Sequence, residues 1–170
     1  MTIWDTKQLK VVGGSSTSVK WISSNKSVVT VGQKNGVVYA RKTGKATITA
    51  RVGGKKLTCK VTVSRIAPGA MKYLKGKWSN ITHDSHGPLY TATIDANKIT
   101  FTYRNGKTAK YTIHAIRRTS YGYFIYFKTS DGRKGGYRYT IGGSGVKSLP
   151  LVAGWNPYST NMSYASGLER

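Results

Sequence analysis

Acidic residues are scarce in this sequence. Its 170 residues include 5 aspartates and glutamates against 28 lysines and arginines, so the formal net charge at pH 7 is +23. Residues 1–66 hold 13 basic residues and 1 acidic residue, and residues 67–170 hold 15 basic and 4 acidic residues. Both halves therefore carry an excess of positive charge. Self-repulsion of this size opposes compaction and indicates a polyanionic partner. The alternative explanation is a host whose surface proteins are all basic.

The shortage of acids also counts against an enzyme. Glycoside hydrolysis needs a pair of carboxylates, and few residues are present to supply one. Asp95 and Asp131 precede turn residues, where turn chemistry explains an aspartate. Neither a Gly-x-Ser-x-Gly nor a His-Glu-x-x-His motif occurs. We therefore predict no catalytic residue and no cofactor. The acids are Asp5, Asp84, Asp95, Asp131 and Glu169.

Cysteine and long apolar runs are also lacking. Cys59 is the single cysteine, which excludes an intrachain disulfide. It shares its alternation phase with Leu57 and Val61, so we predict that it packs as a small apolar side chain. No apolar run approaches the ~20 residues of a membrane-spanning helix, so the chain is predicted not to be transmembrane. The first residues do not resemble a signal peptide. Either the protein is not secreted by that route, or the sequence is a piece of a longer chain.

Strand patterns fill residues 18–63. Apolar and polar residues alternate along 46–52 and 57–63, as a strand with one buried face requires. Asn35-Gly36 is a strong hairpin signal between two short apolar runs. Short strands separated by glycine-rich turns predict a β-sandwich.

Several separated motifs of this first part follow one another in a characteristic order. They are Trp21, Ser23-Ser24-Asn25, Val28, Val31, Asn35-Gly36-Val37-Val38, Gly44-Lys45-Ala46-Thr47-Ile48 and Val61-Thr62-Val63. Together they resemble the bacterial Ig-like domain, group 2, over residues 2–63. The resemblance implies a seven-strand Ig-like sandwich without catalytic residues, common in surface adhesins, wall-associated proteins and some phage virion proteins. It also implies a first strand cut at Met1, which favours a piece of a longer chain.

Composition changes sharply around Pro68-Gly69, which marks a boundary. We predict two domains, an Ig-like sandwich at residues 1–66 and a basic, tyrosine-rich domain at residues 67–170. The second domain holds 11 of the 12 tyrosines and almost no residues with helical periodicity.

Alternation in the second domain predicts antiparallel strands. Apolar and polar residues alternate along 99–104 and 109–115, on either side of an Asn105-Gly106 turn. We therefore predict an antiparallel meander that forms a small β-barrel or a sheet. Gly76-Lys77-Trp78 is similar to the Gly-x-Trp start of lipocalin-like barrels, which favours the barrel. The predicted fold class is all-β throughout.

Basic side chains occupy the polar phase of these strands and the neighbouring loops. In a meander they would share one external surface, which would hold phosphate or carboxylate polymers by many weak, salt-screened contacts. The alternative is an ordinary solvated outer face. The predicted polyanion-binding residues are Lys98, Arg104, Lys110, Arg117, Arg118, Lys128, Arg133, Lys134 and Arg138.

Aromatic residues of the second domain supply further candidates. Phe124 and Tyr126 share a face with Lys128 by alternation, and Trp155 lies in a Gly-Trp-Asn-Pro loop. Exposed rings at these positions would stack on sugar faces or on bases. The alternative is that they line the core.

Three histidines form the only candidate metal site. His83 and His86 flank Asp84-Ser85, and His114 is a possible third ligand. No fourth ligand is evident, and a polar loop explains the first two equally well. We therefore predict no metal site.

Four functions remain open. The first is a non-enzymatic module of the bacterial cell surface or wall, extracellular, that binds an anionic cell-wall polymer or a glycan. The second is a phage or virion attachment or structural protein, with a receptor or virion protein as partner. The third is a single-stranded nucleic-acid-binding barrel, which the Ig-like part disfavours. The fourth, an enzyme, is disfavoured by the few acids.

Overall fold

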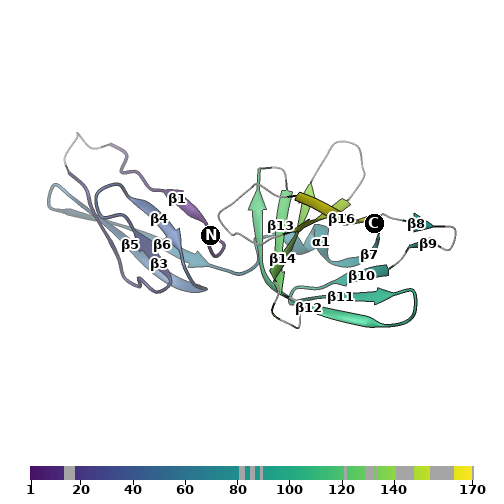
Figure 1. Cartoon of the computed structure of the whole chain (residues 1–170). Coiled ribbons are helices and arrows are strands. Elements are labelled where there is room, and N and C mark those ends of the chain that lie inside the picture. The colour runs from purple at the N-terminus through teal and green to yellow at the C-terminus, as the bar shows by residue number, and fades with distance from the viewer. Residues whose placement is uncertain are drawn as a thin grey trace. The chain divides into compact units, whose positions relative to one another are not determined.

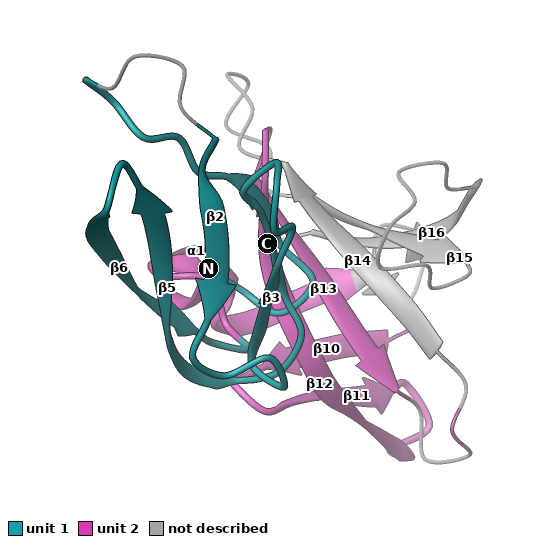
Figure 2. Ribbon diagram, turned by 90° about the vertical axis from the view of Figure 1, so that its left-hand side faces the viewer, with its two compact units in different colours: residues 1–65 teal, residues 66–170 magenta. Residues whose placement is uncertain are grey.

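The computed structural model describes residues 1–13, 18–80, 83–84, 87–88, 90–120, 122–128, 132, 134–140, 148–153 and 163–169 (Figure 1). The chain divides into two compact units, unit 1 at residues 1–65 and unit 2 at residues 66–170 (Figure 2). The sequence-based boundary lies between residues 66 and 67. Each unit has its own buried residues.

Unit 1 consists of two three-stranded antiparallel sheets, ordered β1-β4-β3 and β2-β5-β6. Val38 on β4 and Ile48 on β5 are both 1% exposed, so the two sheets bury residues from each side. The predicted Ig-like β-sandwich is confirmed, with six strands in the described residues where the resemblance implied seven. The strands are β1 (Thr6–Gln8), β2 (Lys20–Ser23), β3 (Val29–Val31), β4 (Val37–Ala40), β5 (Gly44–Val52) and β6 (Lys55–Val63).

The turn at Asn35-Gly36 joins β3 and β4 as predicted. The Asn35 side-chain Oδ1 accepts a hydrogen bond from the Val37 N–H at 3.1 Å. Gly36 has φ +69°, and a Cβ on it would lie 2.7 Å from Cε2 of Trp21. Both the backbone angle and the close indole ring therefore require glycine.

Cys59 does not pack as predicted, because it is exposed. Its neighbour in phase, Leu57, is 46% exposed, whereas Val61 is buried at 9%. β6 is the outer strand of its sheet and pairs with β5. Leu57 and Cys59 lie in the first part of β6, where the residues are exposed on both sides of the strand, whereas burial begins at Val61.

Unit 2 is an eight-stranded antiparallel meander, preceded by one short helix. Its strands pair in the order β7-β10-β11-β12-β13-β14-β15-β16, and β16 pairs in turn with β7, as in a closed barrel. The predicted antiparallel meander is confirmed. Its elements are α1 (Ala70–Leu74), β7 (Gly76–Asn80), β10 (Tyr90–Ile94), β11 (Lys98–Tyr103), β12 (Thr108–Thr119), β13 (Gly122–Lys128), β14 (Lys134–Thr140), β15 (Ser148–Ala153) and β16 (Ser163–Glu169). A separate pair, β8 (His83–Asp84) and β9 (Gly87–Pro88), lies between β7 and β10 in the chain.

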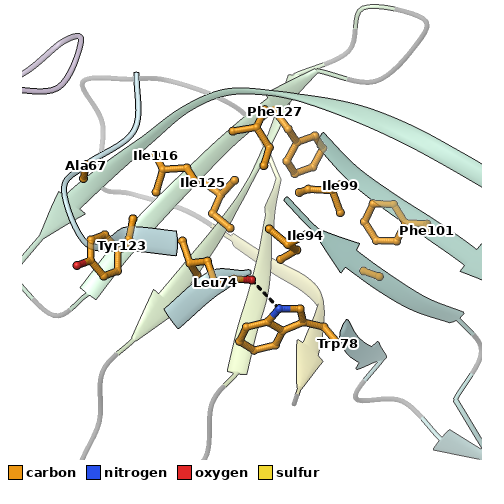
Figure 3. Close-up of a cluster of buried hydrophobic side chains, with 13 residues drawn as sticks. Ala67, Leu74, Trp78, Ile94, Ile99, Phe101, Ile116, Tyr123, Ile125 and Phe127 are labelled. Atoms are coloured by element: carbon orange, nitrogen blue, oxygen red, sulfur yellow. Dashed lines mark hydrogen bonds between the residues drawn. The ribbon is translucent and has the colours of Figure 1, made fainter. Parts of the chain in front are cut away.

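The helix α1 fills one part of the core of unit 2, and the sequence did not predict it. Ala70 and Leu74 are 0% exposed. The Trp78 indole Nε1 donates a hydrogen bond of 3.0 Å to the Leu74 carbonyl, which ties β7 to the end of α1 (Figure 3). The cluster around them includes Ala67, Ala92, Ile94, Ile99, Phe101, Ile113, Ile116, Tyr123, Ile125 and Phe127. No helix in the described part of the chain has the length and apolar character that crossing a membrane requires.

A β-bulge interrupts β12 at His114. Ile113 pairs with Phe127, and the next paired residue, Ala115, pairs with Tyr126. Because one extra residue reverses the alternation, Ile113 and Ile116 both belong to the core cluster. The predicted phase, with Ala115 on the same face as Ile113, is therefore wrong beyond residue 113.

Candidate polyanion-binding face

One face of the meander is built from lysine, threonine and serine. The alternate residues of the same strands, such as Trp78, Ile99 and Ile113, lie in the core cluster, so this face points away from the core. None of its side chains is buried. We call it the Lys–Thr face, and it consists of Lys77, Ser79, Thr91, Thr93, Lys98, Thr100, Thr102, Thr108, Lys110, Thr112 and Lys128.

Strand register aligns these residues in rows across the sheet. In the first row, Lys98 of β11 pairs with Thr112 of β12, and Thr112 pairs with Lys128 of β13. Lys134 of β14 follows opposite Lys128. Strands are about 4.8 Å apart, so the backbones at Lys98 and Lys128 are about 10 Å apart.

The second row runs over the four strands before β13. Lys77 pairs with Thr93, Thr93 with Thr100, and Thr100 with Lys110. It lies two residues along the strands from the first row, which is about 7 Å. Within the Lys–Thr face, threonines thus stand between the lysines of each row. Hydroxyls and ammonium groups are both hydrogen-bond donors to phosphate.

Acidic residues do not occupy the described strand positions of this face from β7 to β13. Asp95 lies in the turn before β11, and its Oδ1 accepts a hydrogen bond from the Ala96 N–H at 2.7 Å. Glu169 of β16 is opposite Ser79, at the other edge of the face. The field across the two lysine rows is therefore positive.

The structure brings three of the nine predicted basic residues together among those whose side chains it describes. Lys98, Lys110 and Lys128 lie on the Lys–Thr face, and Lys134 continues the first row by register. Arg104 is exposed in the turn between β11 and β12. Arg133 lies outside the described residues.

The remaining predicted arginines lie beyond the bulge. Arg117 and Arg138 are both opposite Phe124 in register, and Arg117 is half-buried. Arg118 is opposite Tyr123, whose ring belongs to the core cluster, and is exposed at the end of β12. Because Phe124 shares its side of β13 with Lys128, the register places Arg117 and Arg138 on the same side of the sheet as the first row, further along the strands.

Sequence reasoning missed Lys77 and the threonines between the lysines. Lys77 alternates with Trp78 on β7 and is exposed. The same alternation that identified Lys98 and Lys110 would have found it. The threonine hydroxyls carry no charge, so a search for basic residues did not include them.

The predicted aromatic contacts are not exposed. Phe124 and Tyr126 have ring centroids 4.4 Å apart, and they are 3% and 4% exposed. They lie in the outward phase as predicted, but neither ring is available at the surface, so the prediction that they are exposed is wrong. Trp155 lies outside the described residues.

The three histidines are not brought together as a site in the described residues. His114 is the half-buried bulge residue of β12, and His83 lies on β8. His86 is outside the described part of the chain. Among the described residues, no three His, Cys, Asp or Glu side chains are grouped so that they could hold a metal ion. The absence of a metal site stays a prediction.

Comparisons with known proteins identify the first unit. Residues 5–63 match the family model of the bacterial Ig-like domain (group 2), which confirms the resemblance found over residues 2–63. Such a domain is consistent with a module of the cell surface. The comparison with curated proteins found no match.

Among solved structures, the chain is similar to domains 5-6 of the S-layer protein SbsC. The alignment covers 99% of this chain and 90% of that one, with 18% sequence identity and a TM-score of 0.31. Similarity at this level supports no conclusion about fold or function, so the fold of unit 2 rests on its strand pairings.

Proposed function

Starting from the bacterial Ig-like domain at residues 5–63, we propose that the chain is a non-enzymatic, extracellular module of the bacterial surface or wall. Its second unit binds an anionic cell-wall polymer or anionic glycan through the Lys–Thr face. The observation that carries the proposal is the first row, in which Lys98, Thr112 and Lys128 pair across three strands. The Ig-like unit serves as a spacer.

The chemistry of the face suits a polymer with repeated charges. Ammonium groups are compact point charges that bind phosphate without a fixed geometry. Each exposed contact contributes little, and salt screens it. Two rows of such contacts about 7 Å apart supply many weak interactions at once, and a repeating polyanion engages them together.

The acids whose side chains are described support a non-enzymatic role. Asp5 Oδ2 accepts a hydrogen bond of 2.6 Å from the Thr2 N–H. Asp95 Oδ1 accepts one from the Ala96 N–H. Both carboxylates therefore serve local turns, whereas general acid–base catalysis requires a carboxylate directed at a substrate.

Binding to isolated cell walls, measured by sedimentation over a range of salt concentrations, tests the proposal. The double variant Lys98→Glu, Lys128→Glu reverses two charges of the first row. We expect affinity to fall by about tenfold or more. The slope of log affinity against log salt should fall by roughly two, because a phosphate contact contributes about 0.9 in duplex DNA.

The matched control is Lys26→Glu, Lys34→Glu, which makes the same change in net charge with exposed lysines of unit 1. It should bind almost as the wild type does. Equal losses in both variants would show that net charge alone matters. Binding that ignores salt, or tight binding of oligonucleotides without binding to walls, would overturn the proposal.

A further inference from the structure

Five aromatic rings of unit 2 form a continuous series of contacts towards the β11–β12 turn. The ring centroids of Tyr111 and Phe127 are 5.2 Å apart and stacked, and those of Phe101 and Tyr111 are 4.9 Å apart. Tyr90 lies 5.6 Å from Phe101, and Tyr103 lies 5.8 Å from Tyr90. The series starts at buried rings and ends at the surface.

Exposure is greatest at the last ring of this series. Phe101 and Phe127 are 4% and 3% exposed, Tyr90 and Tyr111 are half-buried, and Tyr103 is 38% exposed. Tyr103 alternates with Thr102, which belongs to the Lys–Thr face, so its ring is on the core side of β11. The aromatic core of the unit thus reaches solvent at the end of this hairpin.

The turn holds Tyr103 firmly in place. Its N–H donates to the Lys107 carbonyl at 2.8 Å, and its carbonyl accepts from the Gly106 N–H at 2.9 Å. Asn105 Oδ1 accepts from the Lys107 N–H at 3.1 Å. These bonds fix the backbone at Tyr103, and the ring of Tyr90 packs against the Tyr103 ring. The Tyr103 ring therefore loses less conformational entropy when a ligand stacks on it.

We infer that Tyr103, supported by Tyr90 and Phe101, is a stacking site for a sugar ring of the anionic polymer. The inference rests on the proposed function and narrows its ligand to a polymer that carries sugar rings beside its charges. Arg104 and Lys107 are exposed in the same turn, which gives the site positive charge next to the ring. A phenol ring offers an apolar face and a polar hydroxyl, and a pyranose has the same combination.

Two soluble polyanions separate stacking from charge. One is a sugar-phosphate polymer, and the other is inorganic polyphosphate, which has no sugar. Wild-type protein should bind the sugar-phosphate polymer about fivefold more tightly at equal charge density. Tyr103→Ala should lose this preference at every salt concentration and keep the salt slope, since stacking releases no counterions.

Two further variants define the role of the ring. Tyr103→Phe keeps the ring and should keep most of the preference. Tyr39→Ala removes a tyrosine of unit 1 that is 40% exposed, and it should bind both polymers as the wild type does. Thermal unfolding of each variant shows whether a lost preference is instead a loss of folded protein.

The outcomes distinguish this inference from the proposed function. If wild-type protein binds both polymers equally, or Tyr103→Ala keeps the preference, the stacking site is wrong while polyanion binding stands. Stronger binding of a single-stranded oligonucleotide than of the sugar-phosphate polymer would overturn the sugar as ligand. If neither polymer binds, both proposals fall.

Discussion

At the scale of single residues, the local environment of a side chain decides what strand alternation leaves open. Leu57 and Ala50 are paired across β5 and β6, yet Leu57 is 46% exposed and Ala50 is 2% exposed. Alternation assigns a residue to one side of a strand, whereas burial depends on what covers that side. Cys59 and Tyr126 were assigned the wrong exposure for this reason.

Gly36 shows the same dependence on neighbours. We expect Gly36→Ala to destabilise unit 1 by about 2 kcal/mol or more, because a strained φ and a clash with Trp21 act together. The control is Gly53→Ala, also in unit 1, where φ is +51° and nothing lies within 4 Å of an added Cβ. That change should cost about 1 kcal/mol. Urea unfolding of both variants measures the difference, and equal losses would contradict the clash.

At the scale of elements, the strands were more predictable than their interruptions. Asn105-Gly106 and the alternation on either side of it predicted the β11–β12 hairpin, because turn chemistry and burial period are both local. The helix α1 has 5 residues, too few to show a helical period. The bulge at His114 has no sequence signal of its own, since pairing with β13 decides where the extra residue goes.

The residues of the candidate site were likewise predictable on regular strands and less so elsewhere. Lys98, Lys110 and Lys128 were found because they alternate with core residues on regular strands. Arg117 and Arg118 were included as residues of a neighbouring loop, whereas the structure places both on β12. Predicting the rows required the register between strands, which a single sequence does not contain.

The contact between α1 and β7 gives a prediction at this scale. Trp78→Phe removes the Nε1 donor and leaves the Leu74 carbonyl without this bond in a buried environment. We expect a loss of about 1–3 kcal/mol in the stability of unit 2. Equilibrium unfolding followed by far-ultraviolet circular dichroism measures it. An unchanged unfolding midpoint in Trp78→Phe would contradict a role for the bond.

At the scale of the whole molecule, charge is the property that both units share. The formal net charge of +23 is spread over both halves of the sequence, and each unit has its own core. The family of unit 1 was evident from ordered motifs, whereas unit 2 was predicted from strand period alone. A positive charge excess is therefore the feature that the two units have in common.

Self-repulsion of this charge predicts how stability responds to salt. The Debye length falls from about 30 Å at 0.01 M to about 8 Å at 0.15 M, so added sodium chloride should screen the lysines from one another. We expect the Tm to rise by several degrees over this range, because repulsion is stronger in the compact state than in the unfolded chain. Differential scanning calorimetry measures this change.

Polyphosphate at low salt should raise the Tm further, since a ligand that binds the folded state stabilises it. In Lys98→Glu, Lys128→Glu the rise with polyphosphate should be smaller than in Lys26→Glu, Lys34→Glu, although both carry the same net charge. A Tm that falls with salt would contradict the self-repulsion. Equal polyphosphate effects in the two variants would show that the arrangement of lysines on the Lys–Thr face has no particular role.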